Sequence, residues 1–539
     1  MNKVLKGLVA VVSTAAMAIA GFAGVSTAMA AETTHTVTIT PAKSGHTYEA
    51  YQIFTGNLGT DGSLGNVVWG SGVDSAKLAA STDTLLKDKS AADVSTALAT
   101  HADNSTQAKA YATAFSGVLS TTHTDSRAFS SAGNGSYTIS GLEDGYYLIQ
   151  DKAGTLSGQN DAYTSFILKI IGDDVTVAPK STQPTVDKKV QDEPADAEQG
   201  ATDGWGDTAD HDINESFKFK LDASIPAEAN LADYKTYKVK FNDTMSKGVT
   251  FESIESVTVN GNDGTAAKSW PLTGTDYDAT TPTPYDATTP TPAGDGTQSW
   301  SLTIDDVIAK CAGIKIAQGF TVEVIYKAHL NENATVNDAS GSTDNKNSVN
   351  LEYSNNPNAE GLGKTEDKTV YVFTFAITNK KVIDNEDGEP LAGAGFKLYK
   401  DEGCTQEYQL VKDATLNAYR PVKGGETAEE MKSSTEGTFP IKGLDAGTYY
   451  LKETTTPKGY TTAAVKTITI KATHTISGGL PNVVLSSDST LDNKIVDKKG
   501  NTLPSTGGMG TTILYAAGAA IVLVAAFGIV FAVRRRNAR

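Results

Sequence analysis

The chain has 539 residues, which leaves room for three or four domains. Its 63 acidic and 46 basic residues give a net charge of -17, which argues against nucleic acid as a partner because nucleic-acid binding needs a basic face. Gly, Thr, Ser and Val are abundant and long helical patterns are scarce, so the composition predicts a mainly β protein built from tandem β-sandwich modules. Whether the two cysteines, Cys311 and Cys404, pair is open at this point.

The chain opens with a predicted secretory signal, residues 1–30. Lys3 and Lys6 supply the charged start, an apolar stretch follows, and Ala28-Met29-Ala30 fits the small-x-small cleavage rule. The mature chain is expected to begin at Ala31.

The first predicted domain covers residues 31–183 and is a β-sandwich with a helical insertion. The insertion is the Ala-rich text of residues 74–119, broken near Asp103-Asn104. Alternating apolar residues predict strands at residues 35–40, 50–54, 137–139, 146–148 and 165–170. Pro179 and Pro184 enclose a short polar stretch that marks the seam with the next domain.

The second predicted domain covers residues 184–368. Its half-buried strands, spaced as in a β-sandwich, lie at residues 217–221, 237–241, 249–251, 299–304 and 320–326. A tandem copy of Tyr-Asp-Ala-Thr-Thr-Pro-Thr-Pro at residues 277–292 predicts an exposed loop or hairpin, because Pro at that density cannot join a sheet ladder. The role of this duplicated loop, a ligand-contacting tip or a neutral one, is open.

The third predicted domain covers residues 369–500, with its clearest strands at 374–377, 395–399, 447–451 and 467–470. Residues 137–148 echo residues 439–451, including a Tyr-Tyr-Leu triplet in each. The first and third domains are therefore expected to share one sandwich plan.

The C-terminal segment, residues 503–539, combines three features in a fixed order. Leu503-Pro504-Ser505-Thr506-Gly507 precedes the apolar run Ile513–Val533, which is long enough to cross a bilayer, and Arg534–Arg536 follows it. This combination resembles the cell-wall sorting signal of Gram-positive surface proteins. The resemblance implies that a sortase cuts between Thr506 and Gly507 and passes the Thr506 carboxyl to an amine.

Two lysines are in phase with apolar residues of predicted strands. Alternation puts Lys188 on the face of Val186 and Val190, and Lys381 on the face of Phe375 and Ile377. A lysine in a core is costly unless it is paired or neutral, and a neutral amine is a nucleophile. A buried acid is pushed toward its protonated form and can then shuttle a proton.

The third domain resembles the CnaB-type module of Gram-positive surface proteins. The resemblance rests on Pro390-Leu-Ala-Gly-Ala394, Tyr450-Leu-Lys-Glu-Thr454 and Leu491-Asp-Asn493. It implies an isopeptide bond between Lys381 and Asn493 that Glu453 assists. Lys380 is the second candidate nucleophile, which alternation disfavours.

The second domain resembles the middle, CnaA-like domain of sortase-assembled pilins. The matching segments are Pro184 to Val190, Phe241-Asn-Asp243 and Asn347 to Tyr353. The resemblance implies a Lys188–Asn347 isopeptide bond that Asp243 assists. Asn345, Asn350 and Asn355 crowd the same stretch and compete with Asn347.

The first domain is predicted to lack an isopeptide bond. Aligning Tyr146–Leu148 on Tyr449–Leu451 puts Gln150 at the place of Glu453, and Gln cannot shuttle a proton. On this alignment Asp151 faces the other way.

Lys180 follows Pro179 at the first seam, where sortase-assembled major pilins carry a Tyr-Pro-Lys type motif, although Ala178 and Ser181 depart from that pattern. The resemblance implies that Lys180 accepts the Thr506 carboxyl of the next subunit. Over nearly the whole chain the sequence resembles Spa-type, sortase-assembled major pilins. The implied function is the shaft subunit of a fimbrium that supports adhesion, and the alternative is a monomeric wall-anchored adhesin of the same modules.

The partners implied are identical subunits, pilin-type and housekeeping sortases, peptidoglycan, minor pilins and host-surface ligands. No cofactor or metal is expected, and the chain is not expected to be an enzyme beyond forming its own internal bonds. A wall-anchored hydrolase is disfavoured because no catalytic constellation stands out and the seven His residues form no ligand-spaced pair.

Overall fold

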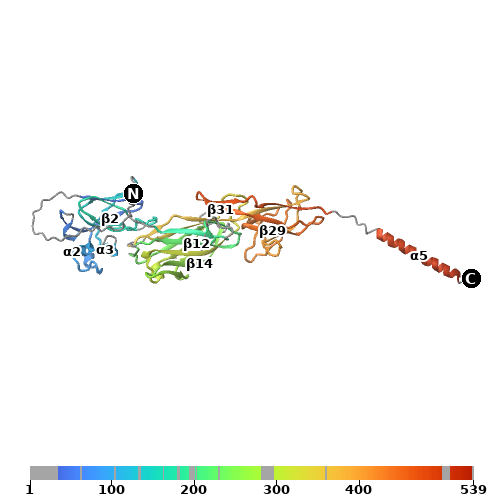
Figure 1. Ribbon diagram of the computed structural model, residues 1–539, viewed down its shortest axis with the longest axis horizontal. Helices are drawn as coiled ribbons and strands as arrows, with labels where there is room; N and C mark the ends of the chain where they lie inside the picture. The colour runs from blue at the N-terminus through green and yellow to red at the C-terminus, as the bar shows by residue number, and fades with distance from the viewer. Residues whose placement is uncertain are drawn as a thin grey trace, which may run out of the picture.

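The computed structural model describes residues 34–60, 63–101, 105–131, 135–161, 163–178, 183–193, 201, 203–228, 231–232, 234–280, 296–357, 361–500 and 510–536. The predicted signal peptide, Lys180, the pentapeptide Leu503–Gly507 and most of the duplicated loop lie outside these residues. The chain forms β-domains arranged in a row, with a long helix at the C-terminal end (Figure 1). The predicted mainly β architecture of tandem sandwiches is confirmed.

The first sandwich consists of two sheets and a helical layer. One sheet has the order β5-β1-β8, with β1 (His35–Ile39), β5 (Tyr137–Leu142) and β8 (Val175–Val177). The other has the order β3-β2-β6-β7, with β2 (Tyr48–Leu58), β3 (Leu64–Trp69), β6 (Gly145–Asp151), β7 (Ser165–Ile170) and the short β4 (Thr124–Asp125) beside β2. Strand β6 is buried on both faces: Tyr147 and Ile149 join the core between the sheets, whereas Tyr146 and Leu148 pack toward the helices.

The predicted helical insertion forms α1 (Ser75–Ala79), α2 (Ala91–Ala99) and α3 (Thr106–Ser116). A capping box between Ser90 and Asp93 starts α2, so the local sequence fixes where this helix begins. The helices contribute Val94, Leu98 and Phe115 to a core that they share with β2 and β6.

The second sandwich is the largest. Its first sheet has the order β10-β9-β12-β18-β14-β15, with β9 (Thr185–Gln191), β10 (Trp205–Gly206), β12 (Ser216–Ile225), β14 (Val249–Asn262), β15 (Ala267–Leu272) and β18 (Phe320–Leu330). The facing sheet contains β11 (Thr208–Asp210), β21 (Lys368–Phe373), β19 (Lys346–Ser354), β13 (Val239–Met245), β17 (Gln298–Ile304) and β16 (Asp278–Ala279), with β20 (Leu362–Lys364) beside β19. Short helices α4 (Val307–Lys310) and η2 (Ile316–Gln318) precede β18. Every second residue of β18 is buried, as alternation predicts.

The third sandwich pairs its first and last strands. One sheet has the order β25-β26-β28-β22-β33, with β22 (Phe375–Ile383), β25 (Leu410–Asp413), β26 (Ala418–Pro421), β28 (Ile441–Leu444) and β33 (Asp492–Asp497). The other contains β23 (Gly395–Tyr399), β24 (Glu407–Tyr408), β29 (Gly447–Thr455), β30 (Lys466–Ile470) and β27 (Met431–Lys432), and β31 (Ala472–Ser477) and β32 (Leu480–Leu485) form a separate hairpin. Because β21 stays in the second sandwich through Phe373, the chain changes domain at Thr374, slightly after the proposed boundary at residue 368.

The C-terminal helix α5 (Gly510–Arg536) is fully exposed where its side chains are described. Its segment Ile513–Arg536 is long and apolar enough to cross a membrane, as the sequence predicted. Both cysteines are free: Cys311 is buried in the second sandwich and Cys404 is half-buried in the third.

Candidate isopeptide sites

Lys188 points into the core between the two sheets of the second sandwich. It lies on β9, in register with Leu221 of β12, and its side chain is fully buried. Its Nζ lies 5.2 Å from the ring centre of Phe219 and 5.4 Å from that of Tyr326. The amine is therefore held in an aromatic cage that excludes water.

The structure brings the three predicted residues of this domain together. Lys188 Nζ donates to Asn347 Oδ1 at 2.8 Å and makes a short ion pair with Asp243. Asp243 lies on β13 and Asn347 on the neighbouring β19, both in the sheet opposite Lys188. Asn347 is the amide at the amine; Asn345 instead bonds the backbone of Thr335 and Val372.

A fourth residue, Tyr326, completes this cluster. Its hydroxyl accepts from Asn347 Nδ2 at 2.6 Å and donates to Asp243 Oδ2 at 3.0 Å, and it also lies 2.9 Å from Lys188 Nζ. Strand alternation predicted a strand through Tyr326, but no sequence motif connects it to Lys188. Its hydroxyl orients both the amide and the acid relative to the amine.

Burial sets the protonation of the Lys188–Asp243 pair. It lowers the pKa of Lys188 to about 8, against the opposing effect of the Asp243 charge. It also raises the pKa of Asp243, although Lys188 and Tyr326 oppose this rise. Both changes favour transfer of the proton from amine to carboxylate, which leaves a nucleophilic amine beside a neutral acid.

Lys381 occupies the equivalent interior of the third sandwich. Its side chain is fully buried on β22, and its Nζ lies 5.4 Å from the ring centre of Phe396. The predicted acid Glu453, on β29 of the facing sheet, accepts from Nζ at 3.1 Å. Lys380, the second candidate, is half-buried and does not share this environment.

The structure places Asp497, and not the predicted Asn493, against the Lys381 amine. Strands β22 and β33 are parallel, with Asn379 opposite Asn493 and Lys381 opposite Ile495. Asn493 therefore lies two residues before Ile495, the register partner of Lys381, and its Nδ2 donates to the Thr490 carbonyl at 2.9 Å. Asp497, two residues beyond Ile495, makes a short ion pair with Lys381. The sequence motif identified the strand, but the register selects a different residue on the same face.

The carboxyl of Asp497 is prepared for reaction by its surroundings. Burial raises the pKa of Asp497 to about 6, opposed by Lys381 and reinforced by Glu453. Glu453 also accepts from the Ala463 backbone N–H at 2.7 Å, which holds it beside Asp497 and Lys381.

The first sandwich contains the acid of this arrangement, Asp151, but no lysine contacts it among the described residues. Tyr147 donates to the Glu143 carbonyl at 3.0 Å just as Tyr449 donates to the Asp445 carbonyl at 2.9 Å. These matched contacts align Asp151, and not Gln150, with Glu453, so the alignment based on Tyr-Tyr-Leu is wrong by one residue. Gln150 points instead toward α3, where its Oε1 lies 3.3 Å from Ser116 Oγ.

A histidine, His46, neutralises the buried acid of the first sandwich. His46 Nδ1 lies 2.7 Å from Asp151 Oδ1, and Nε2 lies 3.1 Å from Asp161 Oδ2. Burial lowers the pKa of His46, but the two carboxylates outweigh this effect and raise it to about 9. Imidazole here balances the charge without supplying the primary amine that an isopeptide bond needs.

Two family models match the chain. Residues 376–480 match a prealbumin-like fold domain named SpaA, and residues 495–538 match the LPXTG cell wall anchor motif. These matches confirm the resemblance to Spa-type, LPXTG-anchored proteins over the third domain and the C-terminal segment. No curated protein sequence matches the chain.

Several solved pilin structures are similar in fold. The full-length major pilin SpaD from Corynebacterium diphtheriae is 19% identical, with a TM-score of 0.44, and the match covers 87% of this chain and 98% of that one. The T6 backbone pilin of serotype M6 Streptococcus pyogenes is 16% identical, with a TM-score of 0.49 and coverage of 87% and 99%. Identity and TM-score are low, so no residue role is transferred from these structures.

Proposed function

We propose that this cell-wall-anchored surface protein, whose third domain is of the SpaA prealbumin-like type, is the shaft subunit of a covalently polymerised fimbrium. The observation that carries the proposal is Lys188, a fully buried amine in contact with both a carboxamide and an acid. A cluster of this kind can form a covalent bond between two strands, and in a fibre under tension such a bond would keep the domain from unfolding.

The proposed bond in the second sandwich joins Lys188 Nζ to the side-chain carbon of Asn347. Asp243 takes a proton from the amine, the neutral amine attacks the carboxamide carbon, and the protonated acid hydrogen-bonds the carboxamide oxygen as it becomes negative. Asp243 passes its proton to the amide nitrogen, the C–N bond breaks and ammonia leaves, and Asp243 takes the remaining proton from the nitrogen of the new amide. Tyr326 orients the amide throughout, since its hydroxyl accepts from Asn347 Nδ2.

The proposed bond in the third sandwich joins Lys381 Nζ to the carboxyl carbon of Asp497. Glu453 accepts a proton from the amine, the amine attacks the protonated Asp497 carboxyl, and water leaves. The leaving group distinguishes this bond from the one first expected at Asn493, which would release ammonia.

Both bonds would close long segments of chain. The linked residues are separated by 159 positions in the second sandwich and by 116 in the third. In the chain-entropy model of cross-links, closing loops of this length stabilises the fold by on the order of 5 kcal/mol each. The third-domain bond joins the first strand to the last, whereas in the second domain β20 and β21 follow the linked strand β19.

Polymerisation is proposed to run from the Thr506 carboxyl of one subunit to the Lys180 amine of the next, with a pilin-type sortase as the catalyst. The support is the LPXTG match and the place of Lys180 just before β9, the strand that carries Lys188. Force entering at Lys180 would reach a cross-linked strand within a few residues. A housekeeping sortase would attach the completed fibre to peptidoglycan, and minor pilins or host ligands would bind the finished surface.

The test is the covalent assembly of the full chain in cells that express its sortase. Wild-type chains should form an SDS-resistant ladder of multimers, and Lys180→Ala should give only monomer. Lys43→Ala, which removes an exposed lysine of the first domain, is the matched control and should leave the ladder unchanged. A ladder that survives Lys180→Ala would contradict the proposed acceptor. Wall-attached monomer without any ladder in the wild type would instead support the monomeric adhesin.

A further inference from the structure

A buried cluster of acids and imidazole lies where the second and third sandwiches meet. Asp192 follows β9, Asp210 ends β11, and His474 lies on β31 of the third sandwich. Their exposed fractions are 5%, 0% and 1%. The two carboxylates thus come from one domain and the imidazole from the other.

The three side chains direct their donor atoms to one point. His474 Nε2 lies 3.2 Å from Asp192 Oδ2 and 3.6 Å from Asp210 Oδ1, and one donor atom from each residue lies within 4.8 Å of the other two. The other ring nitrogen, Nδ1, lies 2.8 Å from the Thr208 hydroxyl. Thr208 therefore holds the ring so that Nε2 faces the two carboxylates.

Asp210 has no hydrogen bond that explains its burial. Neither of its oxygens accepts one from any residue in the described part of the chain, and His474 Nε2 is beyond hydrogen-bonding distance. Its one printed ion-pair partner among the described residues is His474, at 3.6 Å, and a buried charge is found paired or bound to a metal. Asp212, Glu215 and Asp445 add further acid around the same seam, where the Asp445 N–H donates to Asp212 at 2.8 Å.

We propose that Asp192, Asp210 and His474 bind a divalent transition-metal cation of the Zn²⁺ type, which ties the second sandwich to the third. One imidazole nitrogen with two carboxylate oxygens suits Zn²⁺ better than Ca²⁺, which prefers ligands that are all oxygen. Two carboxylates balance the charge of the ion, and water completes its coordination. The proposed site uses the tautomer in which Nδ1–H donates to the Thr208 hydroxyl, because this leaves the Nε2 lone pair for the metal.

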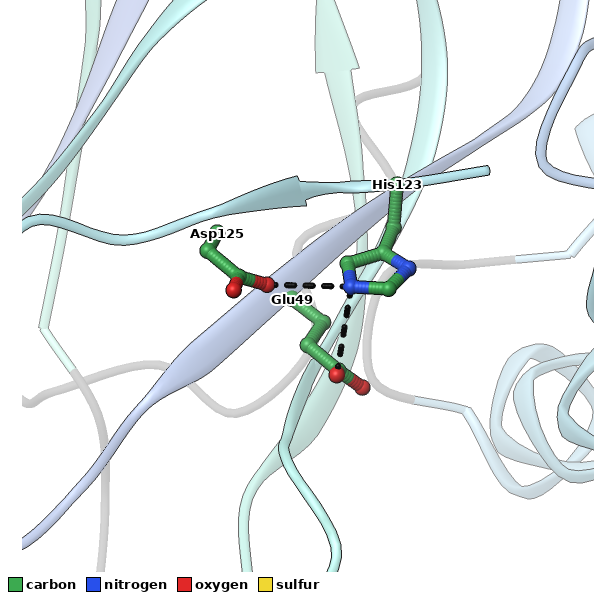
Figure 2. A group of neighbouring side chains, drawn as sticks. All are labelled: Glu49, His123 and Asp125. Atoms are coloured by element: carbon green, nitrogen blue, oxygen red, sulfur yellow. Dashed lines mark ion pairs between the residues drawn. The ribbon is translucent and has the colours of Figure 1, made fainter. Parts of the chain in front are cut away.

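A second cluster, in the first domain, provides the contrast. Figure 2 shows His123 between Glu49 and Asp125, with Nε2 at 3.4 Å and 3.0 Å from their oxygens. Lys152 already balances this pair of acids, at 3.7 Å and 3.5 Å, and Asp125 is 47% exposed. In the cluster at the seam, by contrast, no lysine or arginine among the described residues forms an ion pair with Asp192 or Asp210.

The proposed ion would act where neither isopeptide bond reaches. Each of those bonds lies within one sandwich, whereas Asp192 and Asp210 on one side and His474 on the other lie in different domains. Strand β9 carries Lys188 and leads directly to Asp192. The ion would therefore connect the strand that carries the proposed covalent bond of the second sandwich to the third sandwich.

The test is metal binding by the full chain in detergent, stripped with EDTA and titrated calorimetrically with Zn²⁺, Mn²⁺ or Ca²⁺ alone. The wild type should bind one Zn²⁺ per chain, more tightly than Ca²⁺. Loss of a residue that only supports a metal ligand weakens metal binding by up to roughly 100-fold. Asp210→Asn and His474→Gln each change a proposed ligand, so each should weaken Zn²⁺ binding by more than that. Thr208→Val removes only the partner of His474 and should weaken Zn²⁺ binding by about 10-fold. His123→Gln, the matched control from the other cluster, should leave the affinity unchanged.

A melting experiment separates the metal site from a plain buried ion pair. Without metal, Asp210→Asn should melt at or above the wild-type temperature, because it removes a buried charge whose oxygens accept no hydrogen bond among the described residues. With Zn²⁺, the wild type should melt higher than the variant. If Asp210→Asn does not fold, His474→Gln and Thr208→Val decide the question. No Zn²⁺ binding, tighter Ca²⁺ binding, unchanged binding in His474→Gln, or binding lost in His123→Gln would each overturn the proposal.

Discussion

Lys188 and Lys381 show how burial, and not residue type alone, gives a lysine its chemistry. Both amines are fully buried, and both lie near an aromatic ring and an acid. For Lys188 the loss of water lowers the amine pKa to about 8, close enough to neutrality for the neutral form to be populated. The proposed reaction therefore needs the buried, water-free surroundings of the amine as well as the acid.

Tyr326→Phe should slow bond formation in the second sandwich and weaken its fold. The change removes the hydroxyl that accepts from Asn347 and donates to Asp243, so two buried polar groups lose a partner. The expected loss of stability before the bond forms is about 1–3 kcal/mol. The measurement is the rate at which refolded protein loses about 17 Da, the mass of ammonia released when the amine displaces the amide.

Tyr353→Phe is the control for this prediction. Its hydroxyl donates to Asn160 at 3.1 Å, away from Lys188. If Tyr326→Phe and Tyr353→Phe gave the same rate of mass loss, Tyr326 would have no part in the reaction.

Asp497→Ala should abolish the bond of the third sandwich, and Asn493→Ala should leave it intact. The Lys381 amine contacts Asp497, whereas the Asn493 side chain bonds the Thr490 carbonyl instead. Peptide mass spectrometry should find the Lys381 peptide joined to the peptide of β33 with loss of about 18 Da, the mass of water. A linkage that persists in Asp497→Ala and disappears in Asn493→Ala would restore the bond first expected from the motif.

The strands show where sequence reasoning succeeds and where it stops. Alternation identified β22 and the inward face that carries Lys381, and the resemblance to the CnaB-type module supplied Glu453 on β29. It could not separate Asn493 from Asp497, because both have the same parity on β33 and only the register with β22 tells them apart. Register depends on hydrogen bonds between segments far apart in sequence, which a single sequence does not reveal.

Two other residues illustrate the same limit. Asp151 was assigned to the wrong face because a repeated Tyr-Tyr-Leu triplet shifted the alignment by one residue, which inverts every side chain of a strand. His474 gave no metal signal because its neighbours Asp192 and Asp210 lie far away in sequence. The helical insertion of residues 74–119, by contrast, was predicted from its local composition.

The first sandwich should lose stability as the pH rises, through His46. The folded-state pKa of His46 is about 9, above the usual value of 6.5, so the bound proton stabilises the fold. This contribution is fully present below about pH 6.5 and is lost as the pH rises through about 9, a change of about 3 kcal/mol. Unfolding of this domain by urea at pH 6 and pH 9.5 measures it.

His46→Gln should remove most of that pH dependence and should destabilise the domain at pH 6. His101→Gln, at the end of α2, is the control and should keep it. A domain whose stability stayed constant between pH 6 and 9.5 would contradict the role of His46.

The whole molecule is a row of domains that ends in the anchor helix (Figure 1). In the described part of the first domain no lysine contacts Asp151, the residue that aligns with Glu453, and Lys180 follows that domain in the chain. Load between Lys180 and Thr506 would therefore cross the second and third sandwiches and bypass the first. On this proposal, the domain without a bond would be the one that carries no load.

Pulling single chains from both ends should extend the first sandwich alone. Lys188→Met should add an unfolding step of roughly 500 Å, from the 159 positions that the bond encloses at about 3.4 Å each. Lys381→Met should add roughly 400 Å from 116 positions. Extension of the second or third sandwich in the wild type, at forces that unfold the first, would argue against covalent locking.

The central claim is that two covalent bonds close inside the folded chain, one at an amide and one at an acid. The most direct test is the isotope-resolved mass of the purified chain without its signal peptide. Loss of ammonia at Asn347 and of water at Asp497 predicts a deficit of about 35 Da, since the leaving groups weigh about 17 and about 18 Da. A deficit of about 34 Da would place both bonds on asparagines, and an unmodified mass would contradict the claim outright.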